Sequence, residues 1–129
     1  MSAYKLFKIL IFFIGILLVS CAPAKILQPE EALRFLSEND NKPVIIDLRE
    51  VSSFTAGHIK GAENIPYKKN NFQLRVSSYD KKTPVLIYCG KGLKTSEAAQ
   101  LLKDSGFKNI YTLKGGFESW KNKGYDISK

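Results

Sequence analysis

The chain has 129 residues, with 20 lysines and arginines against 12 aspartates and glutamates and a formal net charge of +8. That length corresponds to one domain and excludes a multidomain enzyme or a long repeat array. Hydrophobic residues make up 44% and charged residues 25%, as in ordinary globular proteins, so disorder throughout is not expected. Two cysteines and one histidine exclude a disulfide-dense miniprotein and a metal site built from several histidines.

The first twenty residues form a segment of their own. Lys5 and Lys8 precede an uninterrupted run of apolar or glycine residues from 9 to 19, which is too short to span a bilayer comfortably. A basic start, a short apolar centre and small residues after it are typical of a secretory signal peptide. The junction Leu18-Val19-Ser20-Cys21 resembles the lipobox of bacterial lipoproteins, which implies cleavage before Cys21 and lipidation of its side chain. The alternatives are an ordinary signal peptide or an uncleaved anchor, with Cys21 incidental.

The lipoprotein interpretation predicts a signal peptide over 1–20, a lipid-anchored tether over 21–25 and a folded domain over 26–129. It places the protein in a bacterial cell envelope, on the periplasmic or extracytoplasmic face. Ala22 after the lipidated cysteine resembles outer-membrane sorting in bacteria with two membranes. The lysines of the mature chain are scattered and form no stripe with interleaved aromatics, so no nucleic-acid partner is expected.

After the tether, strand and helix patterns alternate. Short apolar runs predict strands over 25–27, 44–46, 62–65, 85–88 and 110–113. The unbroken apolar runs at 44–46 and 85–88 predict strands buried on both faces, as in parallel sheets. Apolar periodicity and capping residues predict helices over 29–38, 52–56, 96–105 and 117–123, with an ambiguous helix over 71–79. This order predicts an α/β fold with a central, mostly parallel sheet of about five strands and helices on both faces.

The turn between the strand at 85–88 and the helix at 96–105 carries the chemistry. Cys89 is its first residue, where open α/β sheets place their ligands. Gly90 and Gly92 allow successive backbone N–H groups to face one point, and Lys91 and Lys94 add positive charge next to the helix N-terminus. These features favour a nucleophilic thiolate. The alternative is a buried, inert cysteine at a strand end.

The sequence shows no catalytic triad. His58, the single histidine, lies thirty-one residues before Cys89. A thiolate formed by its own loop needs no base, whereas amide hydrolysis also needs a proton for the leaving nitrogen. The pattern therefore favours sulfur transfer over hydrolysis.

From about Ile26 to Tyr125 the chain resembles a single-domain rhodanese, a thiosulfate sulfurtransferase-type domain. Two motifs carry the resemblance. The first is Asp47-Leu48-Arg49 followed by Gly57-His58-Ile59-Lys60-Gly61-Ala62-Glu63-Asn64-Ile65-Pro66, and the second is Tyr88-Cys89-x-x-Gly92, which continues to Gly115-Gly116 and Trp120.

The resemblance implies a rhodanese-like fold in which Cys89 is the nucleophile that forms a persulfide. It assigns substrate binding to the residues that follow in the loop, namely Gly90, Lys91, Gly92, Leu93, Lys94 and Thr95. It gives Asp47, Arg49 and His58 a structural or site-supporting place. The chain has Lys94 where the family often has arginine, Thr95 where it has serine, and Ser53 where it usually has an acid.

The expected partners are a small anionic sulfur donor such as thiosulfate and an acceptor, which is cyanide, a thiol or a thioredoxin-like protein. A membrane is contacted through the lipid anchor, and no cofactor or metal is expected. One alternative is a non-enzymatic rhodanese-like binding or redox-sensing module. A less favoured alternative is a relative of thiol phosphatases and arsenate reductases, whose longer Cys-x5-Arg loop this chain lacks.

Overall fold

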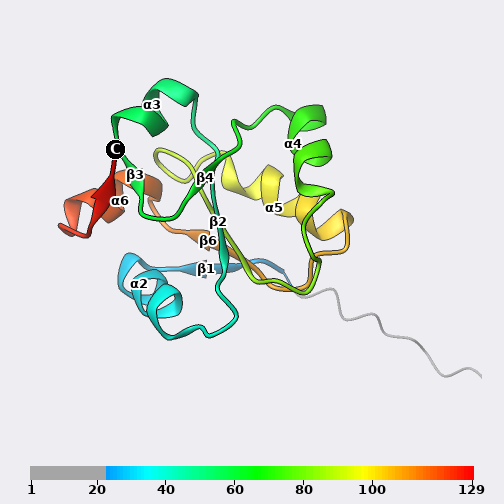
Figure 1. Ribbon diagram of the computed structural model, residues 1–129, viewed down its shortest axis with the longest axis horizontal. Helices are drawn as coiled ribbons and strands as arrows, with labels where there is room; N and C mark the ends of the chain where they lie inside the picture. The colour runs from blue at the N-terminus through cyan, green and yellow to red at the C-terminus, as the bar shows by residue number, and fades with distance from the viewer. Residues whose placement is uncertain (1–22) are drawn as a thin grey trace, which may run out of the picture.

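The computed structural model describes residues 23–129 (Figure 1). The predicted signal peptide and Cys21 lie outside the described residues. Within residues 23–129, no helix has the length and apolar character needed to cross a membrane.

The centre of the molecule is a five-stranded sheet in which every neighbouring pair of strands is parallel. Its strands, in their order across the sheet, are β1 (Lys25–Leu27), β6 (Ile110–Leu113), β5 (Val85–Tyr88), β2 (Val44–Asp47) and β4 (Glu63–Asn64). The middle strand β5 is buried along its whole length, which explains its unbroken apolar sequence.

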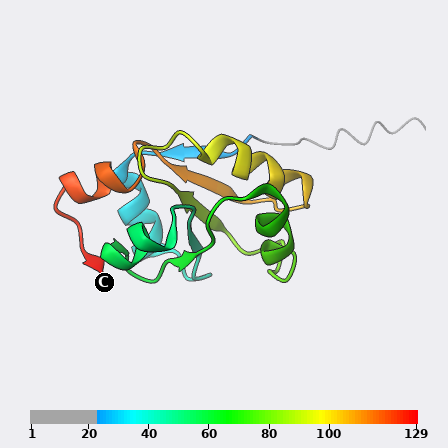
Figure 2. The ribbon, with the colours of Figure 1, turned by 90° about the horizontal axis from the view of Figure 1, so that it is seen from above.

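Helices cover both faces of this sheet, as Figure 2 shows from above. The described chain has five of them, α2 (Pro29–Glu38), α3 (Val51–Ala56), α4 (Lys69–Val76), α5 (Thr95–Asp104) and α6 (Gly116–Asn122). Side chains of α4 and α5 pack in one hydrophobic core, and side chains of α2 and α6 pack in the other. The predicted α/β fold with a parallel sheet between helices is therefore confirmed.

Alternation along β5 assigns its side chains to the two cores. Val85 and Ile87 belong to the α4–α5 core, and Leu86 and Tyr88 to the α2–α6 core. Cys89 continues the alternation and lies on the α4–α5 side. The register of the strand thus determines which face of the sheet receives the thiol.

The structure also contains a small sheet that the sequence pattern did not predict. β3 (His58–Ile59) pairs antiparallel with β7 (Ile127–Ser128) near the C-terminus. Two-residue strands carry no periodic pattern, so pairing between segments this far apart in sequence leaves no local signal. The ambiguous helix is α4, which starts at Lys69 and buries Phe72 and Val76 on one face.

Candidate active site

Cys89 follows β5 directly and opens a loop that ends where α5 begins at Thr95. The residue as a whole is only 5% exposed. The backbone N–H of Gly92 donates a hydrogen bond to the Cys89 sulfur, with 3.0 Å between nitrogen and Sγ. The loop therefore curls back on its first residue and points an amide at the sulfur.

Two local features hold this curl. Gly92 has a φ of +85°, a backbone conformation that L side chains rarely adopt. The hydroxyl of Thr95 donates to the carbonyl oxygen of Gly92 at 3.0 Å, and Thr95 is itself buried. The Thr95 hydroxyl, at the start of α5, thus links the loop to the helix.

The remaining loop residues face outward. Lys91, Leu93 and Lys94 are exposed, and Leu93 is 82% exposed. Beside Gly90 there is open space, because a Cβ added there would meet no atom within 4 Å. The loop therefore presents two lysines and one leucine to solvent around a sulfur that lies beneath them.

The N-terminus of α6 supports the loop from the other side. The N–H of Phe117 donates to the carbonyl of Cys89 at 2.8 Å, and the N–H of Glu118 donates to the carbonyl of Gly90 at 3.1 Å. A Cβ added to Gly116 would lie 2.3 Å from the Cys89 carbonyl oxygen, which no side chain tolerates. The sequence predicts no role for Gly115 and Gly116, although a glycine pair between the last strand and the last helix was a signal for such a close approach.

Asp47 and Arg49 form a pair at the end of the neighbouring strand β2. Asp47 is fully buried, and its carboxylate accepts from the Arg49 guanidinium, with 2.7 Å between Nη2 and Oδ2. The same Nη2 donates to the carbonyl of Gly57 at 2.6 Å, and the guanidinium carbon lies 4.0 Å from the centre of the Phe117 ring. The pair therefore joins β2 to the α3–β3 turn and to α6, the helix that supports the Cys89 loop.

Tyr88 lies between this pair and β3. Its hydroxyl accepts a hydrogen bond from the N–H of Ile59 at 3.1 Å. Burial raises the pKa of the Tyr88 hydroxyl far above its ordinary value, and the nearby Asp47 carboxylate raises it further. The phenol is therefore neutral at physiological pH and serves the packing of this region.

His58 makes its contacts inside the α3–β3 turn. Its Nδ1 is 2.9 Å from the carbonyl oxygen of Phe54, and its ring stacks on the Phe54 ring with 3.8 Å between centroids. None of its hydrogen bonds within residues 23–129 reaches Cys89. Asp47, Arg49 and His58 thus hold the structure that supports the loop, whereas the hydrogen bond to the sulfur comes from Gly92 within the loop.

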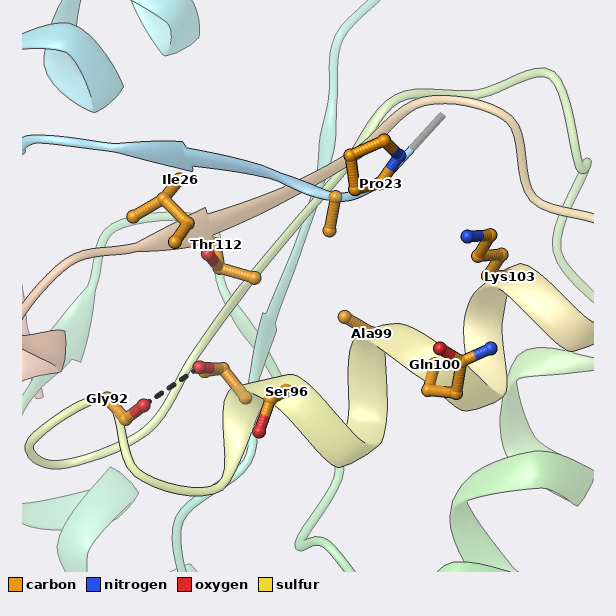
Figure 3. Close-up of a pocket in the computed structure, with 10 residues that line it drawn as sticks. Pro23, Ile26, Gly92, Ser96, Ala99, Gln100, Lys103 and Thr112 are labelled. Carbon is orange, nitrogen blue, oxygen red and sulfur yellow. Dashed lines mark hydrogen bonds between the residues drawn. The ribbon is translucent and has the colours of Figure 1, made fainter. Parts of the chain in front are cut away.

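Cavities flank the loop on both sides. One of about 310 Å³ is lined by Gly92 and Thr95 together with residues of β1, β6 and α5 (Figure 3). A second, of about 450 Å³, shares Gly92 and Thr95 and is also lined by Lys91. A third, of about 430 Å³, is lined by Gly90 together with Arg49 and Lys121. The loop is therefore accessible to small molecules from two directions.

Among residues 23–129, no group of three or more His, Cys, Asp or Glu side chains could hold a metal ion.

Comparison with known proteins places this arrangement in context. A family model described as Rhodanese-like domain matches residues 28–123. The chain is 42% identical over 82 residues to an uncharacterized Bacillus subtilis protein, YqhL. The matching region covers 64% of this chain and 64% of that protein. It therefore spans just under two thirds of the length of that relative.

A second relative is the thiosulfate sulfurtransferase GlpE of Pseudomonas entomophila. It is 33% identical over 98 residues, covering 76% of this chain and 85% of the relative. Among solved structures, the rhodanese-like domain of the Anabaena protein Alr3790 matches with a TM-score of 0.71 and 29% identity. That match covers 83% of this chain and 79% of the other.

Proposed function

The chain belongs to the rhodanese family, and from that premise we propose that it is a sulfurtransferase that carries sulfane sulfur as a persulfide on Cys89. The observation that carries the proposal is the hydrogen bond from the Gly92 N–H to the Cys89 sulfur. An amide N–H that points at the sulfur stabilises negative charge on it, which the attack on a sulfur donor requires.

Electrostatics support the same role. The loop leads directly into the ten-residue helix α5, whose N-terminus is its positive pole. Lys91 and Lys94 are exposed on the loop and add full charges that attract a small anion. Both features favour a negatively charged sulfur and a negatively charged donor at the same place.

The reaction proceeds in two displacements. The Cys89 thiolate attacks the outer sulfur of thiosulfate, a sulfur–sulfur bond forms, and the original sulfur–sulfur bond breaks with its electron pair leaving on sulfite. A thiophilic acceptor, cyanide or a thiolate, then attacks the outer sulfur of the persulfide. That bond breaks toward Cys89, which regains its thiolate, so the cycle involves no net oxidation of the enzyme.

Neither displacement needs a general acid, because sulfite and thiolate leave as stable anions. This agrees with the placement of His58, whose Nδ1 is engaged with the Phe54 carbonyl. The donor is a small anion that fits beside the loop, and the acceptor is cyanide, a small thiol or a thioredoxin-like protein.

We also propose that the domain is anchored in the cell envelope through a lipidated Cys21. The support is the sequence of 1–20, with its basic start and short apolar run, and the four-residue junction that ends in Cys21. Intact-mass analysis of protein from membranes should show loss of residues 1–20 and acyl mass on Cys21. A chain that still starts at Met1 or Ser2 without acyl groups contradicts the anchor and leaves the enzymatic proposal untouched.

The enzymatic proposal is tested by trapping the intermediate. The protein is incubated with thiosulfate alone, quenched with an alkylating reagent and digested, and the Cys89 peptide is weighed. We expect the peptide to gain one sulfur atom and to lose it again after addition of cyanide, with thiocyanate formed in equal amount. If Cys89 stays unmodified with a range of sulfane donors, the enzymatic proposal is wrong and the domain is a non-enzymatic binding or redox-sensing module.

A further inference from the structure

The two edges of the parallel sheet carry different features. The carboxyl ends of the strands lead into the Cys89 loop, α3 and α4. The amino ends of β1, β2, β5 and β6 are preceded by the start of the described chain at Pro23 and by three segments, over 39–43, 80–84 and 103–109, the last of which begins with the final two residues of α5. Figure 1 shows the chain entering β1 on the side of the sheet away from the Cys89 loop.

These amino-edge segments are in contact with one another. The N–H of Lys108 donates to the carbonyl of Lys81 at 3.4 Å, which joins the loops before β5 and β6. Pro23 and Lys25 line a small cavity together with Lys108, so the start of the chain lies against the same loops. The N–H of Val44 donates to the carbonyl of Pro84 at 2.9 Å and brings in the loop before β2.

Figure 3 shows the separation of the two edges in a single view. Pro23 and Lys103 lie at one end of the cavity beside α5, and Gly92 of the active-site loop lies at the other. The point where the chain enters the domain is therefore at the far end of α5 from the sulfur.

The amino edge is rich in lysine. Its segments hold six lysines and three aspartates. Lys81 is partly engaged, with its Nζ 4.2 Å from the centre of the Phe107 ring. Five lysines remain, which we call the amino-edge lysines: Lys25, Lys42, Lys82, Lys103 and Lys108. Within residues 23–129, none of these five forms an ion pair.

Two of the three aspartates at this edge accept hydrogen bonds from amide groups close to them in the chain. The carboxylate of Asp80 accepts from the Lys82 N–H at 2.9 Å, and that of Asp104 accepts from the Gln100 amide at 2.8 Å. These bonds come from uncharged donors and leave the carboxylate charges in place, so six lysines against three aspartates give the segments a net charge of +3 around the place where the chain enters the domain.

The segment that precedes this edge identifies the partner. Pro23 follows Cys21 by two residues, and the apolar run from 9 to 19 lies just before it. Because the segment over 9–21 ends two residues before Pro23, its insertion into a bilayer would bring the amino edge to the level of the lipid headgroups. Lysines at that level are attracted by anionic phospholipids.

We propose that the amino-edge lysines bind the headgroups of anionic phospholipids and hold the Cys89 loop on the side of the domain that faces water. The orientation rests on the membrane attachment given under the proposed function. It limits the sulfur donor and acceptor to molecules that arrive from the aqueous phase. Each lysine near an anionic surface strengthens binding by about fivefold.

Lysine footprinting of the full chain tests this without any substitution. The protein is mixed with vesicles of phosphatidylcholine, with or without phosphatidylglycerol, acetylated briefly, and mapped by mass spectrometry. We expect anionic vesicles to slow acetylation of the amino-edge lysines several-fold, and high salt to abolish the protection. Lys91 and Lys114, at the carboxyl edge, and Lys60 serve as internal references that stay reactive.

Charge reversal gives the matched comparison. The double variant Lys82→Glu/Lys108→Glu should lose about 25-fold or more in affinity for anionic vesicles. Lys60→Glu/Lys121→Glu makes the same charge change elsewhere on the domain and should lose much less. Equal protection of all lysines, protection centred on Lys91, or equal losses in the two variants would overturn the proposal.

The failure of this proposal can be distinguished from the failure of the anchor and of the enzymatic proposal. The peptide map also reports whether Cys21 carries acyl groups, and persulfide formation is measured separately. An acylated protein whose amino-edge lysines stay reactive retains its anchor and contradicts the orientation. A protein without acyl groups that still shows charge-dependent protection supports the surface and contradicts the anchor.

Discussion

The ends of β5 and β2 lie side by side in the sheet, with Tyr88 opposite Asp47 in the register, yet they use charge in opposite ways. At the end of β2, the carboxylate of Asp47 and the guanidinium of Arg49 bind each other and are almost wholly removed from water. At the end of β5, Lys91 and Lys94 stay exposed around a sulfur that is held by a backbone amide. One strand end supports structure, and the other leaves its charges free for a ligand.

The two ends are linked through α6. The Arg49 guanidinium packs on the Phe117 ring, and the Phe117 N–H donates to the carbonyl of Cys89. The Asp47–Arg49 pair therefore positions the loop through α6 and makes no hydrogen bond to the sulfur. This comparison predicts that variants at the two ends separate activity from stability.

Cys89→Ala should abolish sulfur transfer and change the free energy of unfolding little, since the substitution removes only one sulfur atom from the edge of the core. The loss in kcat/KM should exceed about a thousandfold because residues 23–129 hold no second cysteine to carry the transferred sulfur. Thiocyanate formation and urea unfolding are the two measurements. Turnover that survives in this variant means that the nucleophile has been assigned to the wrong residue.

Asp47→Asn should differ from Cys89→Ala by lowering the free energy of unfolding strongly. Removing one partner of a buried ion pair leaves Arg49 without its counter-charge and costs about 3–5 kcal/mol. Glu63→Gln is the matched control, because the Glu63–Arg75 pair is half exposed and breaking it should cost about 1 kcal/mol or less. Equal losses in the two variants, measured by urea unfolding, would mean that burial of the Asp47–Arg49 pair has no energetic weight.

Gly116→Ala should damage both stability and activity. Its left-handed backbone, with φ of +63°, costs about 1–2 kcal/mol for alanine, and the added Cβ also collides with the Cys89 carbonyl. Gly124→Ala is the control, since its φ is +74° but its Cβ would meet nothing within 4 Å. We expect the rate of sulfur transfer to fall sharply in Gly116→Ala alone. A similar rate in both variants would mean that the approach of Gly116 to the loop does not matter for activity.

Lys94→Ala should have the smallest effect, a few-fold rise in KM for an anionic donor with little change in kcat. The side chain is exposed, so its attraction for the donor is screened by salt. Lys94→Arg should restore KM, and Lys60→Ala should leave it unchanged. KM is measured from initial rates at low and high ionic strength. If Lys94→Ala has the same KM as the unsubstituted protein at low salt, Lys94 does not attract the donor.

Much of the fold could be predicted because its signals are local. The apolar run of β5, the Pro29 start of α2 and the periodic face of α5 each follow from a few neighbouring residues. The pairing of β3 with β7 could not, because two-residue strands gain their partner from tertiary contacts. The helix around Phe72 was ambiguous for the same reason, since its packing decides its bounds.

The candidate site divides in the same way. The order of residues around Cys89 already determined a glycine- and lysine-containing turn between a buried strand and a helix, because that turn lies within eight consecutive positions. Only the tertiary structure decided that Phe117 donates to the Cys89 carbonyl, that Arg49 packs on Phe117, and that His58 faces Phe54. These contacts join segments that are distant in the chain, and their geometry exists only once the sheet has brought its strand ends together.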